Sequence, residues 1–144
     1  MILELIVYGK AIGKKSPKVA QRGKFIQLYT DTKTRTYEQD IKNEYIEKYG
    51  DHMLFAPKTP LVVTITEIRA ITLSASKKRA KQALDGQIAP ITKPDTDNIS
   101  KSVLDALKSL AFDDDSRVVE EHIYKKFGEI ECTKIYIREW TKDE

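Results

Sequence analysis

The sequence is poor in several residue types, and each shortage disfavours a class of protein. Its single cysteine, Cys132, cannot form an internal disulfide or a cysteine-based metal site, and we expect it to be a buried core residue. Its two histidines, His52 and His122, lie far from each other and from the cysteine, which disfavours a histidine metal site. No apolar run is long enough to cross a bilayer, so we expect a cytoplasmic protein without a membrane span.

Several catalytic signatures are also missing. The chain has no Walker loop, no Gly-x-Ser-x-Gly and no His-Glu-x-x-His. An EF-hand counted from Asp95 would need glycine at its sixth position and glutamate at its twelfth, where this chain has Ser100 and Ala106. We therefore expect neither serine chemistry nor a nucleotide cofactor.

The charge is distributed unevenly along a chain whose net charge is only +3. Residues 10–24 and 69–93 hold six basic residues each, twelve of the 25, with a single acid between them. Residues 94–121 invert the balance, with eight acids against three basic residues. An acidic centre flanked by basic segments suits a protein that places divalent cations against a polyanion, although solvated loops and a polar helix face would give the same pattern.

The length of 144 residues predicts one domain, 1–144. Hydrophobic periodicity predicts strands at 2–8, 61–68, 117–127 and 130–140, and helices at 32–49, 74–86 and 97–111. We expect a long basic connection at 9–30 and a hairpin turn at Phe127-Gly128-Glu129 that pairs the last two strands. The order β-α-β-(α)-α-β-β predicts an α+β fold, a single mixed sheet with helices mainly on one face.

A compact acidic element, Asp95-x-Asp97-Asn98-x-x-Lys101, stands where a proline-preceded loop enters the helix at 97–111. Two carboxylates held close together suit Mg²⁺ or Mn²⁺, which activate water and neutralise charge on a phosphodiester. Lys101 lies one helical turn after Asp97, on the same face of the helix, where it can contact the negative charge of the phosphodiester. Either aspartate alone is also explained as a helix cap.

A second acidic group, Asp113-Asp114-Asp115, follows the same helix. If the chain reverses after Ala111 and the next strand lies beside the helix, this group approaches Asp95 and Asp97. A solvated acidic turn is the alternative.

The stretch from Lys93 to Val118 resembles the signature of the RusA family of Holliday junction resolvases. Asp-x-Asp-Asn-x-x-Lys, Asp-Ala-Leu and Asp-Asp-x-x-Val follow one another in order. The resemblance implies a homodimeric, Mg²⁺-dependent endonuclease that makes paired, symmetric incisions across a four-way DNA junction, in recombination and repair. It carries the essential catalytic positions onto Asp95, Asp97, Asp115 and Lys101, and it adds Asp114 to the metal-binding acids.

The resemblance also suggests DNA contacts. Where related sequences often carry an arginine-rich patch after the first strand, this chain has Lys14, Lys15 and Lys18, and Lys125 matches a basic position of the family. Lysine keeps the charge but loses the bidentate geometry of arginine. Two alternatives stay open: a nuclease acting on flaps or forks, and a branched-DNA-binding protein without catalysis whose basic arms at 10–24 and 74–81 grip phosphates.

Overall fold

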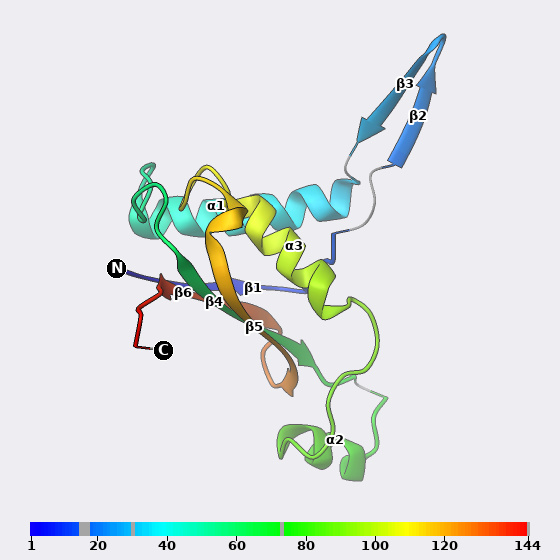
Figure 1. The fold of residues 1–144 in the computed structure, drawn as a ribbon. Helices are drawn as coiled ribbons and strands as arrows, with labels where there is room; N and C mark the ends of the chain where they lie inside the picture. The colour runs from blue at the N-terminus through cyan, green and yellow to red at the C-terminus, as the bar shows by residue number, and fades with distance from the viewer. Residues whose placement is uncertain (15–17, 30, 73, 144) are drawn as a thin grey trace.

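A four-stranded mixed sheet forms the centre of the computed structural model, which describes residues 1–14, 18–29, 31–72 and 74–143 (Figure 1). The strands lie in the order β1 (Ile2–Tyr8), β6 (Cys132–Glu139), β4 (Leu61–Ala70) and β5 (Val118–Gly128). β6 runs antiparallel to both of its neighbours, whereas β4 and β5 are parallel. The expected α+β fold with one mixed sheet is confirmed.

The helices cover one face of this sheet. Leu3, Leu5 and Val7 are buried while the residues between them are exposed, so β1 alternates between a core face and an outer face. The core face packs against α1 (Thr32–Tyr49) and α3 (Thr96–Leu107). The buried residues of α1 recur every three or four positions, whereas α3 is buried over most of its surface from Ile99 onwards. Each large side chain buried there stabilises the fold by about 1.5–3 kcal/mol.

The last two strands do not form the expected hairpin. β4 lies between β5 and β6, and its Val63 pairs with Glu121 on one side and with Ile137 on the other. The run Leu61–Ala70 is apolar enough to take the central position, so the short connection after β5 passes over the end of β4. Gly128 permits that approach, because a Cβ at this position would lie 2.5 Å from Cγ2 of Ile68.

The long connection expected at 9–30 contains a hairpin. β2 (Lys18–Arg22) and β3 (Phe25–Tyr29) pair antiparallel, with Gly23 at positive φ in the turn between them. The hairpin stands away from the central sheet (Figure 1), which explains why Val19, Phe25, Ile26 and Leu28 are largely exposed. This hairpin was not predicted from the sequence, because the lysines and glycines of the segment obscure the short apolar alternation of its strands.

The two remaining helices differ from expectation mainly at their ends. α2 (Lys77–Leu84) begins after Ser76, whose side chain caps the helix by accepting a hydrogen bond from the backbone N–H of Arg79. α3 stops at Leu107 rather than residue 111, and a short 3₁₀ turn, η1 (Asp115–Arg117), leads into β5. Within the described ranges, no helix is both long and apolar enough to span a membrane.

Candidate nuclease site

The start of α3 carries two carboxylates that are not used to build the helix. Asp95 occupies the N-cap position, but its side chain makes no capping hydrogen bond, whereas Asp31 caps α1 and Ser76 caps α2 in the usual way. The only ion pair found for Asp95 in the described residues is a long one, 3.8 Å from Lys93 Nζ to Asp95 Oδ2. Asp97 follows in the first helical turn, exposed and without a hydrogen bond or ion pair to any described residue. Capping therefore does not account for either carboxylate.

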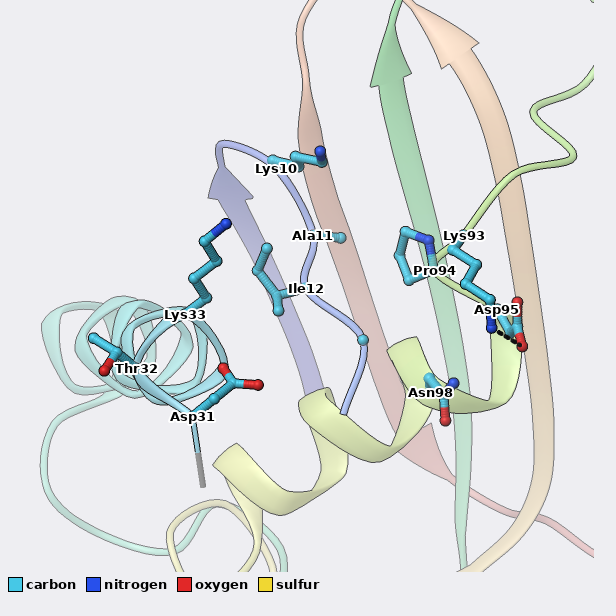
Figure 2. Close-up of a pocket in the computed structure, with 11 residues that line it drawn as sticks. Lys10, Ala11, Ile12, Asp31, Thr32, Lys33, Lys93, Pro94, Asp95 and Asn98 are labelled. Carbon is cyan, nitrogen blue, oxygen red and sulfur yellow. Dashed lines mark ion pairs between the residues drawn. The ribbon is translucent and has the colours of Figure 1, made fainter. Parts of the chain in front are cut away.

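A cavity of about 550 Å³ opens beside this helix start. Its walls come from residues 10–13, residues 31–33 at the start of α1, and the turn at residues 93–95 with Asn98 (Figure 2). Lys10, Lys33 and Lys93 line it, so its rim carries positive charge next to Asp95. Such a combination can accept a phosphate while a carboxylate holds a cation against it.

The segment after β1 is packed directly on α3. The backbone N–H of Lys14 donates to the carbonyl of Asn98 at 2.9 Å, and Ser102 Oγ donates to the carbonyl of Ile12 at 2.7 Å. A Cβ at Gly13 would lie 2.8 Å from Cβ of Pro94, so glycine allows the two segments to touch. The cavity wall is thereby fixed to the helix that bears the acids.

The predicted basic residues have different surroundings. Lys101 is exposed and lies one turn after Asp97 on α3, with no ion pair to any described residue. Lys14 is largely buried, with Nζ 2.6 Å from Glu38 Oε1 and 3.5 Å from Asp105 Oδ2, so it joins α1 to α3. Both carboxylates raise the pKa of Lys14 against the lowering effect of burial, which is the largest single influence. Of Lys18 only the backbone, in β2, is described, and Lys15 lies outside the described residues.

The three acids after α3 are also unequal. Asp113 accepts hydrogen bonds from Arg117, which lower its pKa. Asp114 caps η1 through Ser116 and lies 3.2 Å from Lys108 Nζ, and these contacts lower its pKa to about 2. Asp115 is exposed, and its carboxylate makes neither a hydrogen bond nor an ion pair among the described residues. Asp115 is thus the acid of this group with an uncommitted carboxylate.

The two acidic groups do not meet within one chain. β4 and β5 are parallel and α3 connects them, so the helix must run back against the strand direction. Its 12 residues span about 18 Å and separate Asp95 at its start from the Lys108–Asp114 pair at its end. The expectation that Asp113 to Asp115 fold back towards Asp95 and Asp97 is wrong for a single chain, and the described residues contain no cluster of three potential acidic, histidine or cysteine ligands.

The residues present still suit a hard divalent cation. Mg²⁺ is commonly held by one or two carboxylates together with substrate phosphate oxygens and waters. Asp95 and Asp97 are two such carboxylates, set two residues apart and free of capping bonds. Within the described residues, one chain therefore offers two carboxylates at this helix start rather than a closed set of metal ligands.

Two residues near the site were missed by the sequence analysis, Glu67 and Arg69 of β4. Their side chains point to the core face, where Glu67 is 2% exposed, and they form an ion pair of 3.0 Å. Arg69 then reaches Thr92, in the loop before Asp95. The available signal was a Glu-x-Arg pair within an otherwise uncharged strand, since residues two apart share a face.

Comparison with known proteins identifies the family of this chain. The family model for the endodeoxyribonuclease RusA matches residues 9–138, which include both acidic groups, the cavity and most of the sheet. The chain is also 28% identical over 137 residues to the uncharacterized protein YqaN of Bacillus subtilis (strain 168), covering 95% of this chain and 96% of that protein. Since the family model covers far more than half of the chain, the protein belongs to the RusA family of junction-resolving endodeoxyribonucleases.

Proposed function

We propose that this protein is a Mg²⁺-dependent endonuclease that resolves four-way DNA junctions by paired, symmetric incisions, in DNA recombination and repair. The observation that carries the proposal is the start of α3, where Asp95 leaves its carboxylate uncapped beside that of Asp97. Membership of the RusA family supplies the substrate class. Mn²⁺ is the expected substitute metal, because it accepts the same oxygen ligands.

The roles of the residues follow from their positions. Asp95 and Asp97 hold the divalent cation, which when bound supplies an activated water and neutralises charge on the phosphodiester. Lys101 projects from the same helix face as Asp97 and stabilises the negative charge that develops on the phosphate. Lys10, Lys33 and Lys93 attract the neighbouring phosphates at the cavity rim. Lys15 and Lys18 remain proposed DNA contacts.

Asp115 is proposed to complete the site in a homodimer. Because α3 separates it from Asp95 and Asp97, it can join them only when it comes from a second copy of the chain. Asp114 is a weaker candidate ligand, since its carboxylate is already engaged by Ser116 and Lys108. A dimer built in this way carries two complete sites, one for each of two opposed strands.

The test uses purified protein and a synthetic four-way junction with and without Mg²⁺. We expect paired cuts that disappear in Asp97→Asn while binding to the junction persists, because that carboxylate acts on the metal rather than on DNA. Asp51→Asn, an exposed acid beyond the end of α1, is the matched control and retains cleavage. Normal cleavage by Asp97→Asn would refute the assignment of the site.

Two results of the same assay would replace the proposal. A preference for flaps or forks in a panel of branched and linear DNAs would change the substrate but keep the site. Binding that weakens steeply with salt, shows no dependence on divalent ions and yields no cuts would identify a non-catalytic DNA-binding protein.

A further inference from the structure

The loop before Asp95 is attached to the sheet at one residue, Thr92. Lys125 Nζ, from β5, donates to the carbonyl oxygen of Thr92 at 2.7 Å. Arg69 Nη1, from β4, donates to the same carbonyl at 3.1 Å and to Thr92 Oγ1 at 2.8 Å. Two cationic side chains from adjacent strands therefore fix one residue, and charge-assisted hydrogen bonds of this kind are stronger than neutral ones.

The guanidinium of Arg69 is itself held in place by Glu67. Its Nε donates to Glu67 Oε1 at 3.0 Å, and Glu67 is almost fully buried. Tyr37 lies near Glu67: its hydroxyl shares a 2.7 Å hydrogen bond with Thr133, and its pKa rises to about 12 through burial and the nearby Glu67 charge. A buried carboxylate must keep its cation, so the guanidinium cannot swing out to solvent without leaving that charge unpaired.

Lys125 lies beside this cluster rather than on the outer surface. In the strand register Lys125 lies opposite Glu67 of β4, and Glu67 lies opposite Thr133 of β6. All three side chains therefore point to the face of the sheet that carries the helices. Lys126, the next residue of β5, points to the opposite face, where its ammonium lies 5.2 Å from the ring centroid of Tyr124. The neighbouring lysines of β5 thus have separate environments.

We propose that Lys125 and Arg69 are positioning residues of the nuclease site: they fix Thr92 and, through it, the turn at residues 93–95 that carries the carboxylate of Asp95. The proposal rests on the proposed function, and it assigns to Lys125 a role other than the DNA contact suggested by the family resemblance. Thr92 is three residues before Asp95, and within the described part of the chain the Asp95 side chain makes no capping hydrogen bond that would hold the carboxylate in place. The hydrogen bonds from Lys125 and Arg69 to Thr92 restrain this turn from the side of the sheet.

The expected consequence concerns the metal more than the DNA. Removal of groups that orient metal ligands typically costs ~10–100-fold in metal affinity or activity. Lys125→Met is therefore expected to raise the Mg²⁺ concentration for half-maximal junction cleavage about 10-fold. Junction affinity measured in EDTA, and its dependence on salt, should stay at the wild-type values, because the ammonium faces a carbonyl and not a phosphate.

The design includes a matched control and a rescue. Lys126→Met removes the neighbouring charge on the opposite face and should leave the Mg²⁺ requirement unchanged. Lys125→Arg can still donate to Thr92, so its Mg²⁺ concentration for half-maximal cleavage should be close to the wild-type value. Thr92→Val removes only the hydroxyl acceptor of Arg69 and should shift the Mg²⁺ requirement in the same direction, by less.

Hydrogen exchange provides a readout that does not need activity. The amides of Ile99 and Lys14 donate to the carbonyls of Asp95 and Asn98, so they report on local opening at this helix start. In Lys125→Met they should exchange about 10-fold faster than in Lys126→Met, since the turn then lacks one restraint. If the wild type cleaves no junction, the proposed function fails, and this exchange pattern still decides whether Lys125 holds the turn.

Two results would overturn the positioning role. The first is weaker junction binding by Lys125→Met with an unchanged Mg²⁺ requirement. If the plot of log binding constant against log salt concentration is also less steep by ~0.9, Lys125 is a phosphate contact. The second is unchanged cleavage together with unchanged amide exchange, which identifies a surface lysine without a role in the site.

Discussion

Single side chains distinguish the three acids that follow α3. Asp113 and Asp114 are engaged by Arg117, Ser116 and Lys108, whereas Asp115 keeps its carboxylate uncommitted. We predict that Asp115→Asn abolishes junction cleavage and leaves the urea unfolding midpoint unchanged. Asp114→Asn should retain cleavage and lower that midpoint at neutral pH, because Lys108 loses its ion pair and the hydrogen bonds from Ser116 lose their charged acceptor. Loss of cleavage in Asp114→Asn alone would place the active acid one residue earlier.

The pH dependence of the Asp114 effect has a defined sign. Its carboxyl has a folded pKa of about 2 against an ordinary value of 3.8. A depressed pKa means that the folded state favours the ionised form, so the stabilisation is fully present above the ordinary value and disappears as pH falls to about 2. The midpoints of wild type and Asp114→Asn should therefore converge over that range.

Tyr37 should dominate the alkaline limb of stability. Burial, together with the Glu67 charge, raises its pKa from 10.0 to about 12, although the Thr133 hydrogen bond acts in the opposite direction. Above the ordinary value the unfolded chain releases this proton first, so stability falls with rising pH, by about 1–1.5 kcal/mol up to pH 11. Tyr37→Phe should flatten this fall and cost about 1–3 kcal/mol at neutral pH, because Thr133 loses its partner. Urea unfolding from pH 8 to 11 measures both effects.

At the scale of elements, local patterns predicted what is decided locally. The spacing of Tyr37, Ile41 and Tyr45 identified α1, and the acidic helix start was placed within one residue of α3. Strand pairing is not local. The short link after β5 suggested a hairpin of β5 and β6. Instead the apolar β4 lies between these two strands and pairs with both. The parallel β4–β5 pair then decides that α3 separates the acidic groups, which the sequence pattern alone does not reveal.

The basic helix α2 is predicted to be a DNA contact outside the cleavage site. Lys77, Lys78 and Lys81 are exposed and make no ion pair with a described residue, and the loop after this helix leads directly to Thr92 and Asp95. Replacing all three by glutamine should weaken junction binding and reduce the steepness of its salt dependence by up to ~0.9 per lost phosphate contact. Fluorescence anisotropy over a series of salt concentrations measures both. The triple variant Lys126→Gln/Lys134→Gln/Lys142→Gln removes the same number of exposed charges and is the control, and an equal effect there would indicate only a change in net charge.

For the whole molecule, the length of α3 bears on how the proposed site would assemble. One chain presents Asp95 and Asp97 at one end of the helix and Asp115 beyond the other, so under the proposed function a single copy holds two incomplete half-sites. If two copies join them, mutations in different half-sites should complement one another. Mutations in the same half-site should not.

This predicts a result for mixed dimers that no single variant can give. Differently tagged Asp97→Asn and Asp115→Asn chains, co-expressed and purified as the heterodimer, should contain one site with both substitutions and one with neither. Each homodimer should be inactive, whereas the heterodimer should nick a cruciform plasmid without linearising it, because a single intact site cuts one strand. The Asp95→Asn/Asp97→Asn heterodimer, in which both half-sites at the start of α3 are damaged, should be inactive. An inactive Asp97→Asn/Asp115→Asn heterodimer would instead require all the acids to act within one chain, after a rearrangement of the segment that follows α3.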